Sequence, residues 1–278
     1  TDSTRADVEI PASNASFYAA PDGSGTDCTE QNPCDLDEAL DLAQPGDEVV
    51  LMDGTYSLGE ITLPRSGSEG APVVIRATAG AAPIFDGSDP YAFTWSDQGN
   101  GIWQTTLNSP DTHLVIVDGE RIYPYQSYSD IENLIWSIPG FYCSGTTLNV
   151  KLMDGSSPSN HTVVISRFNH AFYIDGRDHI ILDGLTFRYY GCGSYGKAIY
   201  LNNADWNVIR NCTFVVNDLG VGIKRESNRN VIENCDFSDT IFDWPWDAVK
   251  AGAQLETGGV RFYSPCTGRG NIIRYNTF

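Results

Sequence analysis

A pattern of eight residues recurs in the second half of the chain and predicts its architecture. The pattern Asn207-Val-Ile-Arg-Asn-Cys-Thr-Phe214 returns 23 residues later, from 207 to 230, as Asn230-Val-Ile-Glu-Asn-Cys-Asp-Phe237. A third copy lies at 271–278, and a looser copy lies at 179–187. Each copy contains two adjacent β-branched residues, a polar corner and a closing Phe. This arrangement predicts a short strand, a bend and a second strand whose aromatic ring faces inward.

Another short apolar strand precedes three of the copies, at 198–201, 220–224 and 259–263. Units of this length stack so that each buries its apolar face against its neighbours. We therefore predict an all-β fold, a right-handed parallel β-helix, with neighbouring coils ~4.8 Å apart. The alternative, an antiparallel β-sandwich, gives no reason for Asn at two fixed places in each unit. A β-helix does, because stacked Asn side chains at a bend can hydrogen-bond along the ladder. The residues expected inside are Ile209, Phe214, Ile223, Ile232, Phe237, Val260 and Phe262.

The rest of the chain divides around these coils. Residues 1–16 form a polar leader, and residues 17–278 form a single β-helix domain. A helix is predicted at 35–43, where apolar residues follow the helical period, and it would cap the first coil. Residues 88–166 break the repeat, are rich in Trp and Tyr, and are interpreted as an inserted β-rich subdomain. The last copy ends at Phe278 without a capping segment, so we expect that end to be incomplete or covered by another chain.

The net charge excludes some classes of binding partner, and the cysteines indicate the compartment in which the protein occurs. The chain has 17 Lys and Arg against 36 Asp and Glu, a net charge of −19, which argues against nucleic acids and anionic membranes as partners. No apolar run is long enough to span a membrane. Cys28 and Cys34 bracket a polar loop, which predicts a disulfide and a secreted protein, extracellular or periplasmic. Cys212 and Cys235 hold the same place in adjacent coils and are expected to be buried thiols.

Alternation along the strands that precede the octets predicts one polar face. Five side chains should point outward on the same sheet: Tyr200, Asn202, Lys224, Arg261 and Tyr263. Lys224 and Arg261 fall on consecutive coils once the excursion at 238–258 is allowed for. They are either a functional pair or solvated cations that are bridged to acids such as Glu226.

Several stretches resemble those of a known enzyme family. Residues 36–56, Leu-Asp-Glu-Ala-Leu-Asp-Leu-Ala-Gln-Pro-Gly-Asp-Glu-Val-Val-Leu-Met-Asp-Gly-Thr-Tyr, and residues 70–77 resemble the opening of secreted β-helix polysaccharide lyases, closest to polysaccharide lyase family 6. Residues 223–237 resemble the stretch that carries the family's catalytic lysine, here Lys224. Residues 260–262 resemble the stretch that carries its catalytic arginine, here Arg261.

The resemblance implies an enzyme that cleaves an acidic, uronate-containing polysaccharide by β-elimination. The family also has acidic Ca²⁺ ligands shortly before the lysine. The nearest matches are Asn217 and Asp218, and loop oxygens of Asp243 and Asp247 extend the expected calcium site. The residues assigned to substrate binding are Tyr200, Asn202, Arg225 and Tyr263. The insertion at 88–166 departs from the lyase pattern and is similar to those of β-helix glycoside hydrolases.

Two other functions fit the same scaffold. A glycoside hydrolase needs two carboxyl groups ~5–10 Å apart. Acids are plentiful, but no spacing singles out a pair among Asp175, Asp218, Asp243, Asp247 and Glu256. The third possibility is a non-catalytic β-helix, such as an adhesin or a surface-assembly protein, because the fold alone does not determine function.

Overall fold

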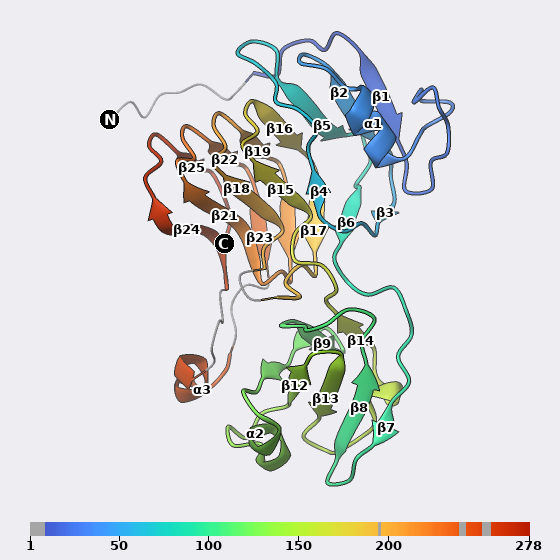
Figure 1. Ribbon diagram of the computed structural model, residues 1–278, viewed down its shortest axis with the longest axis vertical. Coiled ribbons are helices and arrows are strands. Elements are labelled where there is room, and N and C mark those ends of the chain that lie inside the picture. Colours follow the sequence, from blue (N-terminus) through green and yellow to red (C-terminus); the bar gives the residue numbers. More distant parts are fainter. Residues whose placement is uncertain (1–8, 194–195, 239–242, 252–256) are drawn as a thin grey trace.

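Most of the chain winds into a solenoid of parallel strands in the computed structural model, which describes residues 9–193, 196–238, 243–251 and 257–278 (Figure 1). The candidate acid Glu256 and parts of the 238–258 excursion lie outside the described residues. Three sheets form the walls of the solenoid, and each complete coil adds one strand to each sheet. All neighbouring strands within these three sheets are parallel.

Sheet 1 has seven strands in the order β1 (Ser16–Ala19), β2 (Glu48–Leu51), β5 (Val73–Ala77), β16 (Ile180–Asp183), β19 (Val208–Arg210), β22 (Val231–Glu233) and β25 (Ile272–Arg274). Sheet 2 has the order β3 (Thr55–Tyr56), β6 (Ile84–Asp86), β17 (Thr186–Arg188), β20 (Thr213–Val215) and β23 (Asp236–Ser238). Sheet 3 has the order β4 (Ile61–Thr62), β15 (Phe172–Asp175), β18 (Ile199–Asn202), β21 (Leu219–Arg225) and β24 (Gly258–Cys266). The predicted parallel architecture is confirmed.

Each octet spans the corner from sheet 1 to sheet 2, as its pattern predicts. The fifth residue takes the left-handed conformation that the bend requires, with φ of 52° at Asn211 and 54° at Asn234. Asn tolerates this region because its short polar side chain bonds locally. The first residue of the octet forms a ladder between coils. Asn230 Oδ1 accepts from the backbone N–H of Asn207 at 2.9 Å, and Asn271 Oδ1 accepts from that of Asn230 at 3.0 Å.

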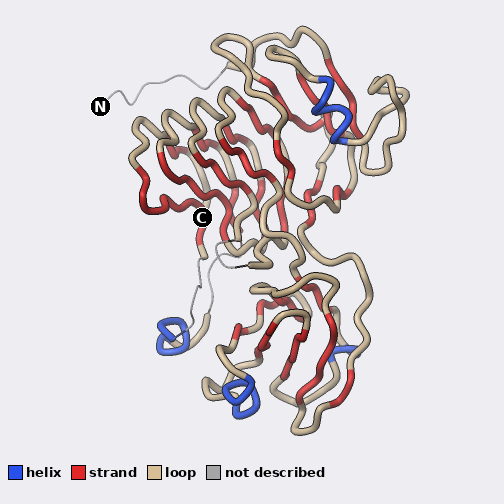
Figure 2. The backbone as a smooth tube through the Cα atoms, viewed as in Figure 1, coloured by secondary structure: helices blue, strands red, loops and turns tan. Residues whose placement is uncertain are grey.

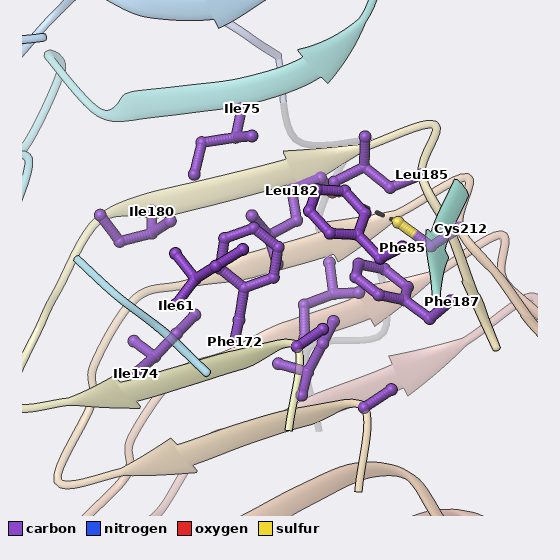
Figure 3. Close-up of a cluster of buried hydrophobic side chains, with 14 of the residues drawn as sticks. Ile61, Ile75, Phe85, Phe172, Ile174, Ile180, Leu182, Leu185, Phe187 and Cys212 are labelled. Atoms are coloured by element: carbon purple, nitrogen blue, oxygen red, sulfur yellow. Dashed lines mark hydrogen bonds between the residues drawn. The ribbon is translucent and has the colours of Figure 1, made fainter. Parts of the chain in front are cut away.

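Aromatic rings fill the interior behind sheet 2. Six rings from successive coils stack with centroids 4.6–5.4 Å apart and planes within 21° of parallel, in the order Tyr56, Phe85, Phe187, Phe214, Phe237 and Phe278. Aliphatic residues of sheets 1 and 3, among them Leu182 and Ile174, belong to the same core as the ring of Phe85 (Figure 3). The core is therefore a continuous column that runs along the solenoid axis.

Most of the residues expected inside are buried. Ile209, Phe214, Ile223, Ile232 and Phe237 are at most 2% exposed, and Val260 packs against the same core. Phe262 is an exception. It pairs with Ile223 and so lies in an inward column, but 47% of it is exposed because β24 is the edge strand of sheet 3. The expectation of a buried Phe262 is wrong for that reason.

The first coil is covered by a helix. Helix α1 (Leu36–Leu42) begins at Asp35, whose side chain accepts from the backbone N–H of Glu38 at 2.8 Å. Its buried residues Leu36, Ala39 and Leu40 join the main core. Cys28 and Cys34 are bonded to each other, which confirms that prediction. Cys212 and Cys235 are buried free thiols, as expected. No helix in the described part of the chain is long and apolar enough to cross a membrane.

The chain leaves the solenoid after β6 and returns at β15, and the intervening residues fold on a core of their own (Figure 2). One sheet has the order β11 (Tyr123–Pro124), β12 (Gly140–Ser144), β13 (Thr147–Lys151), β8 (Ile102–Thr106) and β7 (Ser96–Asp97). A second has the order β10 (Glu120–Arg121), β9 (Val115–Val117) and β14 (Val163–Ile165), and the helical elements are α2 (Tyr128–Asn133) and η1 (Pro158–Asn160).

Helix α3 (Trp246–Ala251), on the excursion between β23 and β24, meets this insertion. The Tyr123 hydroxyl donates to the carbonyl of Ala248 at 2.6 Å, and the ring of Trp244 lies 5.2 Å from that of Tyr123. Ala248 is fully buried in this contact. The excursion is therefore packed against the insertion through an apolar cluster.

The Asn ladder should contribute measurably to stability. Asn230→Ala removes the acceptor of the Asn207 N–H and the donor to the Ala204 carbonyl, which leaves buried polar groups without partners. We expect a loss of about 2–4 kcal/mol in the free energy of unfolding, measured by denaturant titration. The control Asn234→Gly changes an exposed residue with positive φ and should have an effect under about 1 kcal/mol. Equal losses in the two variants would contradict a role for the ladder.

Candidate functional site

The outward surface of sheet 3 carries two columns of side chains that cross successive coils. The register places Tyr173, Tyr200, Gly222 and Arg261 in one column. It places Asp175, Asn202, Lys224 and Tyr263 in the other. The predicted outward residues of this sheet are therefore on one surface. Lys224 is half-buried, whereas Arg225 and Arg261 are exposed.

Tyr263 lies at the centre of the cationic part of this surface. The Arg261 guanidinium is 5.1 Å from the centre of its ring, and Lys224 is its register partner on the neighbouring strand. The ring of Tyr200 meets it edge-on with centroids 6.2 Å apart. A cation within about 6 Å of an aromatic ring is attracted by the ring's quadrupole. The tyrosines thus hold positive charge close together on this face.

A third cation, Lys197, was not found from the sequence. Its Nζ is 4.2 Å from the ring centre of Tyr200 and 4.7 Å from that of Tyr263, and only 1% of the residue is exposed. It precedes β18 and reaches across the sheet over Gly222. A Cβ atom at residue 222 would lie 2.3 Å from Lys197 Cδ. The sequence feature that could have indicated Lys197 is Gly222, because a Gly inside a strand often marks the close approach of another group.

His170 and Glu60 lie beside the tyrosines. His170 Nδ1 donates to the Lys197 carbonyl at 2.9 Å, and its ring is 5.4 Å from that of Tyr200. Burial, together with the nearby positive charge of Lys197, lowers the pKa of His170 to about 4. Burial raises the pKa of Glu60, whose Oε2 is 4.0 Å from His170 Nε2. At pH 7 the imidazole is neutral, so this contact is not a charge pair.

Asn202 connects the aromatic and acidic parts of the face. Its Nδ2 donates to the Tyr173 hydroxyl at 3.1 Å and to Asp175 Oδ1 at 2.8 Å. Tyr173 stacks on Tyr200 with ring centres 5.2 Å apart. Three tyrosines from three coils therefore form a continuous strip. Aromatic faces flanked by polar side chains suit the apolar faces and hydroxyl groups of a sugar.

The four residues expected to bind calcium make other contacts or lie on the excursion. Asn217 Nδ2 donates to the Phe187 carbonyl at 2.9 Å, and Asn217 Oδ1 accepts from the Tyr190 N–H at 3.0 Å. Asp218 is buried and pairs with Arg121 of the insertion at 2.6 Å. Of the other two, Asp243 is exposed, and Asp247 pairs with Lys250 at 2.9 Å.

The described residues contain no cluster of three or more His, Cys, Asp or Glu side chains that could hold a metal ion. The arrangement therefore does not fit a calcium ion shared by these four residues. A calcium requirement stays an untested prediction.

Comparisons with known proteins agree with this architecture. Residues 150–278 match the family model of the right-handed β-helix region, and residues 31–92 match the model of chondroitinase B. Pectate lyase L of Dickeya chrysanthemi is 30% identical over 98 residues, which are 32% of this chain and 23% of that protein. The chain thus matches about a quarter of this curated relative's length.

Solved structures show the same fold at low sequence identity. The complex of XylC with xylose has a TM-score of 0.62 at 14% identity and matches 94% of this chain and 58% of that one. A glycoside hydrolase has a TM-score of 0.58 at 12% identity, over 90% and 68% of the two chains. Pectate lyase Pel9A has a TM-score of 0.50 at 17% identity, over 95% and 47%.

These findings define an all-β solenoid of parallel strands. More narrowly, the solenoid is a right-handed parallel β-helix, as predicted, and its fold is similar to that of pectate lyase Pel9A. The assignment of the chain to polysaccharide lyase family 6 stays a prediction.

The depressed pKa of His170 makes stability depend on pH. Between its ordinary value near 6.5 and about 4, the unfolded chain binds more protons at this site than the folded protein does. The free energy of unfolding should therefore fall as the pH drops, by roughly 3 kcal/mol from this residue. In His170→Asn, whose amide can donate to the same carbonyl, that part of the decline should vanish. Denaturant titrations of both proteins from pH 4 to 7 measure the difference, and identical slopes would refute it.

Proposed function

We propose that this protein acts on an acidic, uronate-containing polysaccharide and cleaves it by β-elimination. One observation carries the proposal. In a chain of net charge −19, Lys197, Lys224 and Arg261 gather around the tyrosines of one sheet face. Positive side chains beside aromatic rings suit a sugar that carries a carboxylate. The chondroitinase B and pectate lyase L matches support a polysaccharide substrate.

Each step of the elimination has a candidate group on this face. A uronate C5 proton is weakly acidic, and Arg261 would neutralise the adjacent carboxylate so that the proton can leave. Lys224, in its neutral form, would take that proton. The bond between C4 and the glycosidic oxygen breaks as the C4–C5 double bond forms, and the departing oxygen takes a proton from a donor or from water.

Hydrolysis on the same face is less well supported. Glu60, whose raised pKa suits a general acid, lies beside His170, whereas Asp175 is at the far end of β15. Ile61 pairs with Phe172, so Glu60 is level with residue 171 and four residues from Asp175. At ~3.3 Å per residue, the backbone positions of the two acids are offset by roughly 13 Å along the strand direction. Glycosidases need carboxyl groups ~5–10 Å apart, so this offset does not favour the two acids as such a pair.

The protein is also proposed to be secreted, to an extracellular or periplasmic location. The Cys28–Cys34 disulfide supports this, because such bonds persist in oxidising compartments.

Substitution of the two cations should separate their roles. Lys224→Ala should lower turnover by a factor on the order of 10²–10⁴ with little change in melting temperature, since it removes the base from a partly exposed position. Arg261→Ala should raise KM and lower turnover. Arg261→Lys should recover only part of the lost activity, because lysine cannot make the two parallel hydrogen bonds that a guanidinium makes to a carboxylate. The measurement is the ultraviolet absorbance of the unsaturated product over a panel of acidic polysaccharides.

Lys250→Ala is the matched control, because it removes an exposed lysine of α3 and should leave turnover unchanged. Near-parental turnover in Lys224→Ala would exclude Lys224 as the base. New reducing ends without ultraviolet absorbance would indicate hydrolysis, and binding with neither signal would indicate a non-catalytic β-helix.

A further inference from the structure

Lys197 is buried at the centre of the polar face, although the sequence resemblance assigns it no role. Its charged end lies between the rings of Tyr200 and Tyr263, 4.2 Å and 4.7 Å from their centres. A buried lysine is uncommon because desolvation penalises the charged form. The two ring faces recover part of that cost, since a desolvated cation interacts more strongly with an aromatic ring than an exposed one does.

The surroundings of Lys197 are specific to it. His170 Nδ1 donates a hydrogen bond to the Lys197 carbonyl at 2.9 Å. This bond fixes the backbone at Lys197, from which the lysine side chain extends. Gly222 leaves the space that the side chain crosses, because a Cβ there would lie 2.3 Å from Lys197 Cδ and 2.9 Å from Tyr263 Cε2. The backbone of residue 222 does not itself require Gly, since it is not among the glycines with positive φ. Its small size is what the position needs.

Lys197 thus connects two tyrosines on different coils, and one of them supports Arg261. The Tyr263 ring has Lys197 at 4.7 Å and Arg261 at 5.1 Å, and Lys224 is its partner in the sheet register. Any movement of this ring would alter the separation of Arg261 from Lys224. Lys197 itself is 1% exposed and does not reach the surface where a polysaccharide would lie.

We propose that Lys197 is a positioning residue that clamps Tyr200 and Tyr263 and thereby sets the spacing of Arg261 and Lys224 for an anionic sugar. The expected effect on substrate cleavage rests on the proposed function. The clamp, meaning the contacts of Lys197 with the rings of Tyr200 and Tyr263, is a property of the free protein. It also predicts that Gly222 acts on the same ring contacts as Lys197, because a Cβ there would meet both Lys197 Cδ and Tyr263 Cε2.

Three single variants and one double variant test the proposal. Lys197→Met keeps much of the volume and removes the charge, and Lys197→Arg keeps the charge. Gly222→Ala keeps the charge but displaces the lysine. We expect kcat/KM on the cleaved polysaccharide to fall by about 10- to 100-fold in Lys197→Met and in Gly222→Ala, and Lys197→Arg to retain more activity than Lys197→Met. The double variant Gly222→Ala with Lys197→Met should lose no more than the worse single variant. Lys250→Met is the matched control and should behave as the parent.

A measurement without substrate separates this inference from the proposed function. In the parent, NMR of labelled His and Tyr should show contacts between the Tyr200 and Tyr263 rings and a His170 pKa of about 4. Lys197→Met should weaken the ring contacts and raise the His170 pKa, because the nearby positive charge is removed.

The outcomes are distinct. A parent that neither binds nor cleaves acidic polysaccharides overturns the proposed function, and the NMR result then decides whether the clamp exists. Unchanged ring contacts in Lys197→Met overturn the clamp. Parental kcat/KM in Lys197→Met, with an active parent, overturns its role in positioning. Additive losses in the double variant overturn the action of Gly222 on the same ring contacts as Lys197.

Discussion

Alignment of equivalent residues in successive coils is the constraint on which the rest of this structure depends. A single coil cannot bury its apolar residues or satisfy its backbone N–H groups, so both needs are met by the neighbours. The Asn ladder and the stack of six aromatic rings meet them at fixed positions. Because both repeat at the same place in each coil, a shift of one residue in one coil would break contacts on both sides of it. The polar columns of sheet 3 are in line for this reason.

Charges on the outer face of sheet 1 obey the same alignment but are arranged differently from those on sheet 3. One column on sheet 1 alternates in sign across five coils, in the order Arg76, Asp183, Arg210, Glu233 and Arg274. Ion pairs of 2.9 Å between Arg210 and Asp183 and 2.6 Å between Arg274 and Glu233 follow from it. Each cation faces an acid on a neighbouring coil, and a misaligned coil would separate these pairs. On sheet 3, Lys197 and Arg261 lie against tyrosine rings, and the proposed function rests on this arrangement.

The sequence predicted the fold because the repeat itself records the alignment. The first and fifth residues of the octet gave the ladder and the left-handed bend, and alternation placed Tyr200, Asn202, Lys224 and Arg261 on one face. It did not predict Lys197, because that side chain starts at a corner and reaches over a neighbouring strand, where alternation gives no direction. It misjudged the exposure of Phe262, because periodicity gives the direction of a side chain and not whether another strand covers it. The buried partner of Asp218 was not foreseen, because Arg121 lies on the insertion, 97 residues away.

The insertion and the excursion leave the solenoid at the same corner, and that corner also leads to the candidate site. The insertion lies between β6 and β15, and the excursion lies between β23 and β24, so both leave the solenoid at the corner from sheet 2 to sheet 3. They meet through Tyr123 and Ala248, and Arg121 ties the insertion to Asp218 just before β21. The same corner leads into the strands that carry Tyr200, Lys224 and Arg261. Loops on a rigid scaffold can vary without disturbing its register. The long segments at this corner are therefore placed where they can shape access to the polar face, while the aligned coils keep the spacing of its charges constant.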